Sequence, residues 1–187
     1  FVAYTDPSPA VKKYLLMRAS DGVTFSAIAT LAKPTTTTIT YTDNSVTTNN
    51  KSYSYKLIAT DSCGNAIKTS NIGTTILLGT TFNTDVSITL RWNNYGDWLG
   101  KTEHYNIYRA VDGVLNTTPI ATVPYTDTNG VYTDDIAPFL TTNLGIFSYY
   151  VEAVESAGNI HGFTDTSRSN IKKVFVYPKI FIPNAFT

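Results

Sequence analysis

Alternating hydrophobic and polar positions run through most of the chain, and they predict short β-strands. In the stretch 86–92 every second position is apolar, and the residues there are Val86, Ile88, Leu90 and Trp92. Side chains two apart on a strand share one face, so these four are expected to face a core. Two later stretches have inward-facing residues at the same spacing: Tyr105, Ile107 and the stem of Arg109, then Tyr149, Val151 and Ala153. Turn signals every 8 to 12 residues and the lack of an apolar stripe at helical spacing favour a β-sandwich.

The same pattern occurs twice, with a period of 91 to 99 residues. Three of the repeated blocks are Tyr14–Arg18 with Tyr105–Arg109, Tyr41–Asp43 with Tyr132–Asp134, and Ser70–Ile72 with Ser169–Ile171. Asp21-Gly22 recurs as Asp112-Gly113, where a hairpin turn is expected because glycine tolerates positive φ. Blocks that keep one order throughout predict two copies of a single domain.

The repeat divides the chain into three parts. We expect one domain over residues 1–78, a second over 79–178, and a connecting segment over 179–187. The first copy has fewer residues before its Tyr14 strand than the second has before Tyr105, so residues 1–4 are interpreted as the end of its second strand. The first strand of this copy is then expected outside the sequence, which predicts an exposed or borrowed sheet edge.

Composition agrees with an all-β protein and excludes several classes. Threonine and tyrosine, which favour strands, number 31 and 13, while the 14 basic and 14 acidic residues balance. A neutral chain is a poor candidate for binding nucleic acid, and no apolar run is long enough to insert into a membrane. The single thiol, Cys63, cannot form an internal disulfide, and no cysteine or histidine pair has metal-ligand spacing.

The strand carrying Trp92, the Tyr105–Arg109 strand, Tyr132–Asp134 and the strand from Tyr149 to Ala153 resemble strands B, C, E and F of fibronectin type III domains. The resemblance implies two tandem fibronectin type III-like or immunoglobulin-like sandwiches, the first lacking its N-terminal strand.

The last ten residues, 178–187, carry a narrower resemblance. They read Pro-Lys-Ile-Phe-Ile-Pro-Asn-Ala-Phe-Thr, and with the preceding domains they are similar to the region before the gliding motility-associated C-terminal domain of Bacteroidota surface proteins. That domain is the type B sorting signal of the type IX secretion system. The resemblance implies export to the cell surface or medium and a linker toward the sorting domain, formed by Pro178, Ile180, Phe181, Ile182, Pro183, Asn184 and Phe186.

The candidate binding site is the loop after the Trp92 strand. Tyr95 and Trp98, with the polar neighbours Asn94 and Asp97, could form an aromatic platform for a glycan or a partner protein. The competing interpretation is that Trp98 folds over the open end of the sandwich. Trp92 itself is expected in the core.

Catalytic and metal sites are weaker hypotheses. His104 and His161 are expected to be surface residues, and the acidic pairs Asp134 with Asp135 and Glu152 with Glu155 are expected to be solvated turn and edge charges. Calcium at a domain joint is an alternative, with Asp43, Asp61, Asp134 and Asp135 as ligands, although no contiguous calcium loop is present. No cofactor is expected.

Three functions remain open. The first is a non-catalytic spacer of a secreted or surface-attached protein, a gliding adhesin among the candidates. The second is a glycan- or protein-binding module using the loop from Tyr95 to Trp98, and the third is an accessory part of a secreted hydrolase.

Overall fold

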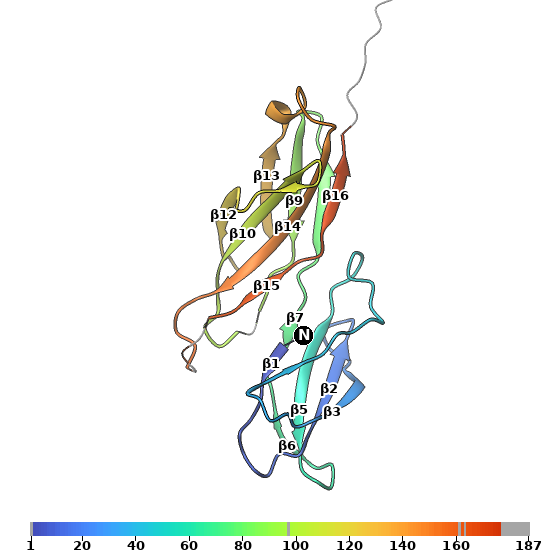
Figure 1. Ribbon diagram of the computed structural model, residues 1–187, viewed down its shortest axis with the longest axis vertical. Coiled ribbons are helices and arrows are strands. Elements are labelled where there is room, and N and C mark those ends of the chain that lie inside the picture. Colours follow the sequence, from blue (N-terminus) through green and yellow to red (C-terminus); the bar gives the residue numbers. More distant parts are fainter. Residues whose placement is uncertain (1, 97, 161, 163, 177–187) are drawn as a thin grey trace, which may run out of the picture.

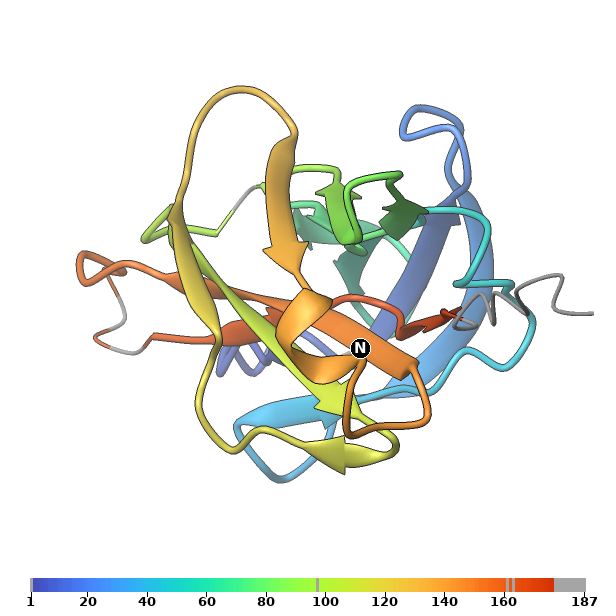
Figure 2. The ribbon, with the colours of Figure 1, turned by 90° about the horizontal axis from the view of Figure 1, so that it is seen from above.

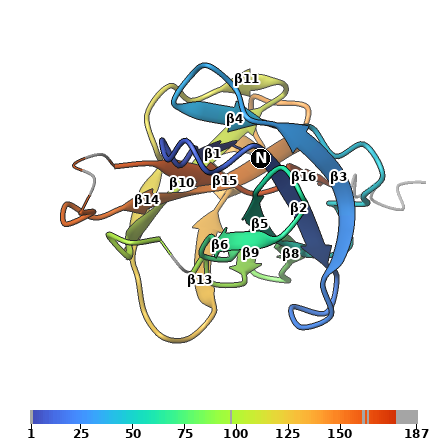
Figure 3. The ribbon, with the colours of Figure 1, turned by 90° about the horizontal axis from the view of Figure 1, so that it is seen from below.

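The computed structural model describes residues 2–96, 98–160, 162 and 164–176, and it contains two β-sandwiches placed end to end (Figure 1). Copy one consists of β1 to β7 and copy two of β8 to β16. Figure 2 looks along the long axis from the copy-two end, and Figure 3 looks from the copy-one end. The expected all-β tandem sandwich is confirmed.

Copy two has two complete sheets. One contains β8 (Leu78–Phe82), β9 (Ser87–Trp92) and β13 (Gly130–Asp135), with β9 in the centre. The other is built on β10 (Thr102–Val111) and β14 (Ile146–Glu155), and its remaining strands are β11 (Val114–Leu115), β12 (Ala121–Pro124), β15 (Thr166–Arg168) and β16 (Lys172–Phe175). A short 3-10 helix, η1 (Ala137–Phe139), follows β13. Strand β8 also contacts β16, so it closes one side of the sandwich.

Within the described residues, copy one repeats this arrangement with one strand fewer in each sheet. Its larger sheet contains β2 (Lys13–Ala19), β3 (Ser26–Ala32), β5 (Ser54–Thr60), β6 (Ala66–Thr69) and β7 (Gly73–Thr74). Its smaller sheet pairs β1 (Val2–Tyr4) with β4 (Thr38–Thr40), and within the described residues β1 has no second neighbour. The described part of copy one therefore contains no counterpart of β8.

The inward-facing residues predicted for copy two form its core. Ile88, Leu90 and Trp92 are each no more than 2% exposed. Tyr149, Val151 and Ala153 are fully buried on the facing sheet, and Tyr105 and Ile107 join them. Val86 differs slightly, because it lies in the turn before β9 with a φ of 63° and packs against the core only in part.

The predicted hairpin turn at Asp112-Gly113 is also confirmed. Val111 pairs with Val114 across it, and both central residues have positive φ, 50° and 88°. This is the two-residue turn that matches the twist of the adjoining strands. No helix in the described part of the chain is long and apolar enough to cross a membrane.

The joint between the copies is short and is held by side-chain amides. Strand β7 ends at Thr74 and β8 begins at Leu78. Asn93 accepts a hydrogen bond from the Leu77 amide at 2.6 Å and donates to the Thr75 carbonyl at 3.3 Å. Asn170 accepts from the Leu78 amide at 2.7 Å and donates to the Leu78 carbonyl at 3.2 Å. The connecting backbone is therefore fixed to copy two on both sides.

Two further contacts cross from copy two to copy one. The Lys172 ammonium donates to the Asn49 carbonyl at 2.8 Å, and the Asn170 amide lies 3.4 Å from the Asn49 side-chain oxygen. A loop of copy one is thereby attached to the strand that ends copy two's larger sheet.

Candidate functional site

The loop predicted to bind a ligand is folded against its own sandwich. The Tyr95 amide donates to the Tyr105 hydroxyl at 2.8 Å, and the Tyr95 carbonyl accepts from the Thr102 hydroxyl at 2.8 Å. The Asn94 side chain donates to the Thr126 carbonyl at 2.7 Å and accepts from the Tyr105 hydroxyl at 3.3 Å. These bonds fix the start of the loop, and Asp97 lies outside the described residues.

The two loop aromatics contact each other and the core. The Tyr95 and Trp98 rings lie 4.2 Å apart between centroids, and both are partly buried against the hydrophobic cluster that contains Trp92. Their remaining exposed surface faces a groove between the copies. Tyr95 and Trp98 are therefore in contact, with part of their surface used in packing, and Asn94 is bonded to Thr126 and Tyr105.

Glu155 fixes the loops at this end of copy two and corrects the expectation of a solvated charge. Its side chain is 1% exposed. One oxygen accepts from the Gly100 amide at 2.9 Å and from the Asn159 side chain at 2.9 Å, and the other accepts from the Asp165 amide at 3.1 Å. A buried carboxylate with these donors ties together the loops on both sides of its strand. The local sequence pattern gave no sign of this burial because the Gly100 and Asp165 donors come from other loops.

Asp134 was also expected in solvent and is instead 5% exposed inside copy two. It accepts from Arg109 at 2.8 and 2.9 Å and from the Tyr149 hydroxyl at 2.7 Å. The guanidinium of Arg109 also lies 4.0 Å from the ring centroid of Phe139. Burial and the hydrogen bond to Asp134 raise the pKa of Tyr149. The neighbouring Asp135 points the other way and accepts from the Ala137 amide at 3.0 Å, so the two carboxylates do not converge.

Copy one contains an equivalent group of an arginine, an aspartate and a tyrosine, and this group is more exposed to solvent. Arg18 donates to Asp43 at 2.7 Å and the Tyr55 hydroxyl donates to it at 3.0 Å. Burial raises the pKa of Asp43, but hydrogen bonds from Ser45, Arg18 and Tyr55 outweigh it and hold the pKa at about 2. The Arg18 side chain is 23% exposed, against 10% for Arg109. The repeated Arg, Asp and Tyr in the sequence were the signal that could have found this buried group.

Glu152 is a third carboxylate that the sequence placed in solvent. It is 7% exposed, accepts from Arg168 at 2.6 Å and lies 3.5 Å from the Tyr108 hydroxyl. Tyr108 stacks on Tyr150 at 4.6 Å between ring centroids, and Arg168 covers Tyr150 at 5.2 Å. These side chains lie on the outer face of the larger sheet. There Arg168 and Tyr108 contact the Glu152 carboxylate and leave it little access to solvent.

The remaining candidate catalytic and metal-binding residues that the structure describes do not come together. His104 lies 3.7 Å from Glu103, and His161 is outside the described residues. Asp61 accepts from the Cys63 and Asn65 amides in its own turn, and the thiol of Cys63 is exposed. The four aspartates considered for calcium bind different partners, and the described residues contain no group of three or more His, Cys, Asp or Glu that could hold a metal. The predicted linker to a sorting domain, from Pro178 to Phe186, lies outside the described residues.

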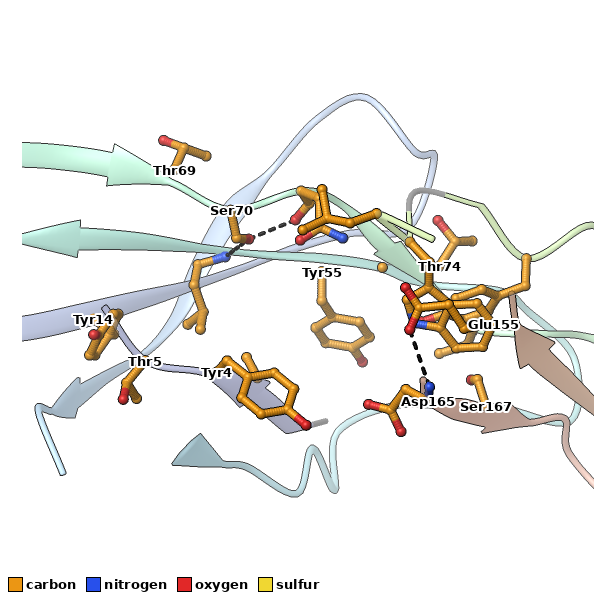
Figure 4. Close-up of a pocket in the computed structure, with 18 of the residues that line it drawn as sticks. Tyr4, Thr5, Tyr14, Tyr55, Thr69, Ser70, Thr74, Glu155, Asp165 and Ser167 are labelled. Carbon is orange, nitrogen blue, oxygen red and sulfur yellow. Dashed lines mark hydrogen bonds between the residues drawn. The ribbon is translucent and has the colours of Figure 1, made fainter. Parts of the chain in front are cut away.

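A groove of about 1340 Å³ begins in copy one and ends at copy two. Figure 4 shows Tyr4 and Thr5, at the end of β1, on one side and Thr69, Ser70 and Thr74 on the other, with Tyr14 and Tyr55 between them. Glu155, Asp165 and Ser167 of copy two close the far end.

Comparisons with known proteins add little to this geometry. No protein family model matches the chain, and no curated protein matches it. Among solved structures, it is similar to the crystal structure of the FN1–FN3 domains of chicken CNTN1, with a TM-score of 0.39 and 13% sequence identity. The match covers 89% of this chain, and the chain spans 56% of the length of that one. The fold assignment therefore rests on the strand pairing described above.

Proposed function

We propose that this chain is a non-catalytic spacer that holds two sandwiches in line within a larger secreted or cell-surface protein. The observation that carries the proposal is the joint between the copies. Its backbone from Thr75 to Leu78 is bonded to Asn93 and Asn170, and Asn49 of copy one is bonded to Lys172. A linker with this many anchors resists bending, whereas a free linker of the same length would act as a hinge.

The hydrogen bonds made by the buried carboxylates support a non-catalytic role. Asp134 is occupied by Arg109 and Tyr149, and Glu155 is occupied by Asn159 and two backbone amides. A general acid or base needs access to a substrate atom, and these carboxylates have their oxygens bonded inside the fold. They serve to connect strands and loops.

The spacer proposal is tested by the tumbling of the two copies in solution. NMR relaxation and residual dipolar couplings of the intact chain should give one rotational correlation time and one alignment tensor for both copies. The double variant Asn93→Ala, Asn170→Ala should separate them, while Asn143→Ala, which removes an exposed amide in the loop before β14, at the end of copy two that carries the Asp112-Gly113 turn, should not. Independent tumbling of the copies in the unmodified chain would contradict the proposal.

Export by the type IX system is the second part of the proposal. It is supported by the resemblance of residues 178–187 to the segment before the type B sorting domain. The partner would be the secretion machinery, and the location would be the cell surface or the medium, with a gliding adhesin among the candidate parent proteins. The mass and C-terminal sequence of the native polypeptide in each cell fraction test this. Continuation through a Pro-Asn-Gly-Asp-Gly turn into a further domain is expected, and a native chain without it in every fraction would overturn export by this route.

Ligand binding is the alternative, and the groove favours it because Tyr95 and Trp98 lie along its copy-two end. A glycan or a protein would be the ligand class. An accessory role in a secreted hydrolase would place the catalytic groups in another part of the protein.

A further inference from the structure

The larger sheet of copy one ends at β3, and within the described residues the outer edge of this strand has no neighbour. Strand β3 pairs with β2 on its other side, and β12 pairs with β10 at the equivalent place in copy two. Copy two has β8 in its smaller sheet and still leaves β12 without an outer neighbour. An open edge at this position is therefore a property of the sandwich.

Strand β3 is the least protected edge strand of the two larger sheets. It has seven residues, and none of them is charged or a proline. The other edge strands that the structure describes in these sheets have at most four residues. Those with four contain Lys68 in β6, Pro124 in β12, or Lys172 and Lys173 in β16. Short length, lysine and proline keep an edge from pairing with another chain, and β3 has none of these features.

The register shows which backbone groups of β3 face the open edge. The Lys33 amide, just after β3, donates to the Lys12 carbonyl at 3.2 Å. Alternate residues of an antiparallel strand turn their N–H and C=O to opposite sides. Counting back from Lys33, Thr30 and Ala32 direct these groups away from β2. The bulge of β3, at Ile28, lies outside this regular stretch.

We propose that β3 pairs antiparallel with β3 of a second copy of this chain, with the two-fold axis beside Leu31. In this register Thr30 lies opposite the partner's Ala32, and each such pair exchanges both of its outward backbone hydrogen bonds. Leu31 lies opposite itself, and Lys33 lies opposite the partner's Ala29, so no like charges meet. Because the same strand serves both copies, the assembly closes at a dimer.

The side chains of β3 suit pairing with an identical strand. Thr30 and Ala32 are exposed, while Leu31 is half-buried and packs against the core of copy one. Two Leu31 side chains placed opposite each other would lose their remaining contact with water, which favours association. In copy two the equivalent positions are Thr122 and Pro124, and the proline has no amide to donate.

This pairing goes beyond the spacer role and does not depend on it, because no hydrogen bond of the joint involves β3. A chain with a flexible joint would keep the same edge.

The test is sedimentation equilibrium of the intact chain between about 1 µM and 1 mM, a range that spans weak to moderate association. A reducing agent keeps the exposed Cys63 from linking copies. A reversible equilibrium between monomer and dimer is expected. Hydrogen exchange followed by NMR should show that the amides of Thr30 and Ala32 gain protection as the dimer forms.

Charge variants at the two outward positions make the result specific. Thr30→Lys with Ala32→Lys should weaken the dimer at least about tenfold, because like charges then lie directly opposite each other. Thr30→Glu with Ala32→Glu should do the same, and a mixture of the lysine and glutamate variants should dimerise again. Thr122→Lys with Pro124→Lys, the matched change in copy two, should leave the dimer unchanged. Circular dichroism melts establish that each variant is folded.

A chain that stays monomeric over the whole range overturns the proposal, and so does a dimer that the paired lysines at 30 and 32 leave intact. Failure of the mixed, folded variants to associate would likewise overturn it. Should Thr30 and Ala32 gain protection only when a different protein is added, the edge belongs to that partner and not to a second copy.

Discussion

Copy one and copy two fill the same position in the sandwich with opposite combinations of large and small residues. In copy two Trp92 lies over Gly130, and a Cβ on that glycine would overlap the indole. In copy one Ala3 is the small partner, and Ile39, which is 7% exposed, is the large one. The core of copy two also gains Ile76 and Leu78 from β8 and its approach, for which the described part of copy one has no counterpart. The same sequence pattern therefore places different side chains at equivalent positions of the two cores.

The largest effect is expected from changing the paired residues Trp92 and Gly130 in copy two. Trp92→Ala should cost about 3–5 kcal/mol of unfolding free energy because it leaves a cavity in a closed core. Gly130→Ile alone should prevent normal packing, given the contact with the indole. The double variant Trp92→Ala, Gly130→Ile, which installs the combination of copy one, should recover part of the loss. Urea unfolding monitored by hydrogen exchange measures this, and a double variant less stable than either single one would refute the pairing.

The next largest effect is expected from removing the aspartate of each Arg, Asp and Tyr group. The loss of stability should be larger in copy two than in copy one. Asp134→Ala leaves Arg109 buried without its partner and should cost about 3 kcal/mol. Asp43→Ala should cost roughly half as much, because the Arg18 side chain reaches solvent. Both tryptophans lie in copy two, so their fluorescence reports its unfolding separately. Equal losses in the two copies would contradict the difference in burial.

Acid should destabilise copy one through Asp43. The pKa of its carboxyl is about 2 in the folded chain, against 3.8 for an unperturbed aspartate. Since the folded-state pKa is the lower one, the contribution is present above about pH 4 and is lost as the pH falls toward 2, at most about 2 kcal/mol. Asp43→Asn should flatten this part of the pH profile of copy one. Denaturant midpoints between pH 2 and 5 measure it, and an unchanged slope in the variant would remove Asp43 from the explanation.

Trp98→Ala should have the smallest effect, about 1–2 kcal/mol in copy two, because its side chain is only partly buried. The variant also separates packing from ligand binding. A lower melting temperature with unchanged binding on a glycan array supports packing, whereas lost binding at unchanged melting supports the site at Tyr95 and Trp98.

Features that depend on nearby residues could be predicted from the sequence. Alternation predicted the burial of Leu90 and Trp92, and Asp112-Gly113 predicted its hairpin, since both patterns act within a few residues. The interpretation of residues 1–4 as the end of a second strand rested on counting residues against the repeat, and β1 lies beside β4 as β9 lies beside β13.

Features that depend on distant partners were missed. Asp134 and Glu155 were predicted to be surface charges because their hydrogen-bond donors come from other strands and loops. The donor to Asp134 is Arg109, and the donors to Glu155 include the Gly100 and Asp165 amides. Burial of a charge is decided by what the fold brings to it, and local pattern carries no such information. For Asp134 the repeat did carry a sign, in the recurrence of Arg18, Asp43 and Tyr55 as Arg109, Asp134 and Tyr149.

The placement of β8 and β16 has a consequence for tension. Strand β8 starts at the joint and β16 runs toward the opposite end of copy two, and the two strands are in contact (Figure 1). A pull applied between the joint and Val176 would load these strands in shear, so the hydrogen bonds of β8 with β9 would have to yield together instead of one after another. Resistance to such a pull is set by the rate of unfolding and not by the equilibrium free energy. Copy two therefore meets such a pull in shear, and Asn93 and Asn170 anchor the backbone at the point where the force enters it.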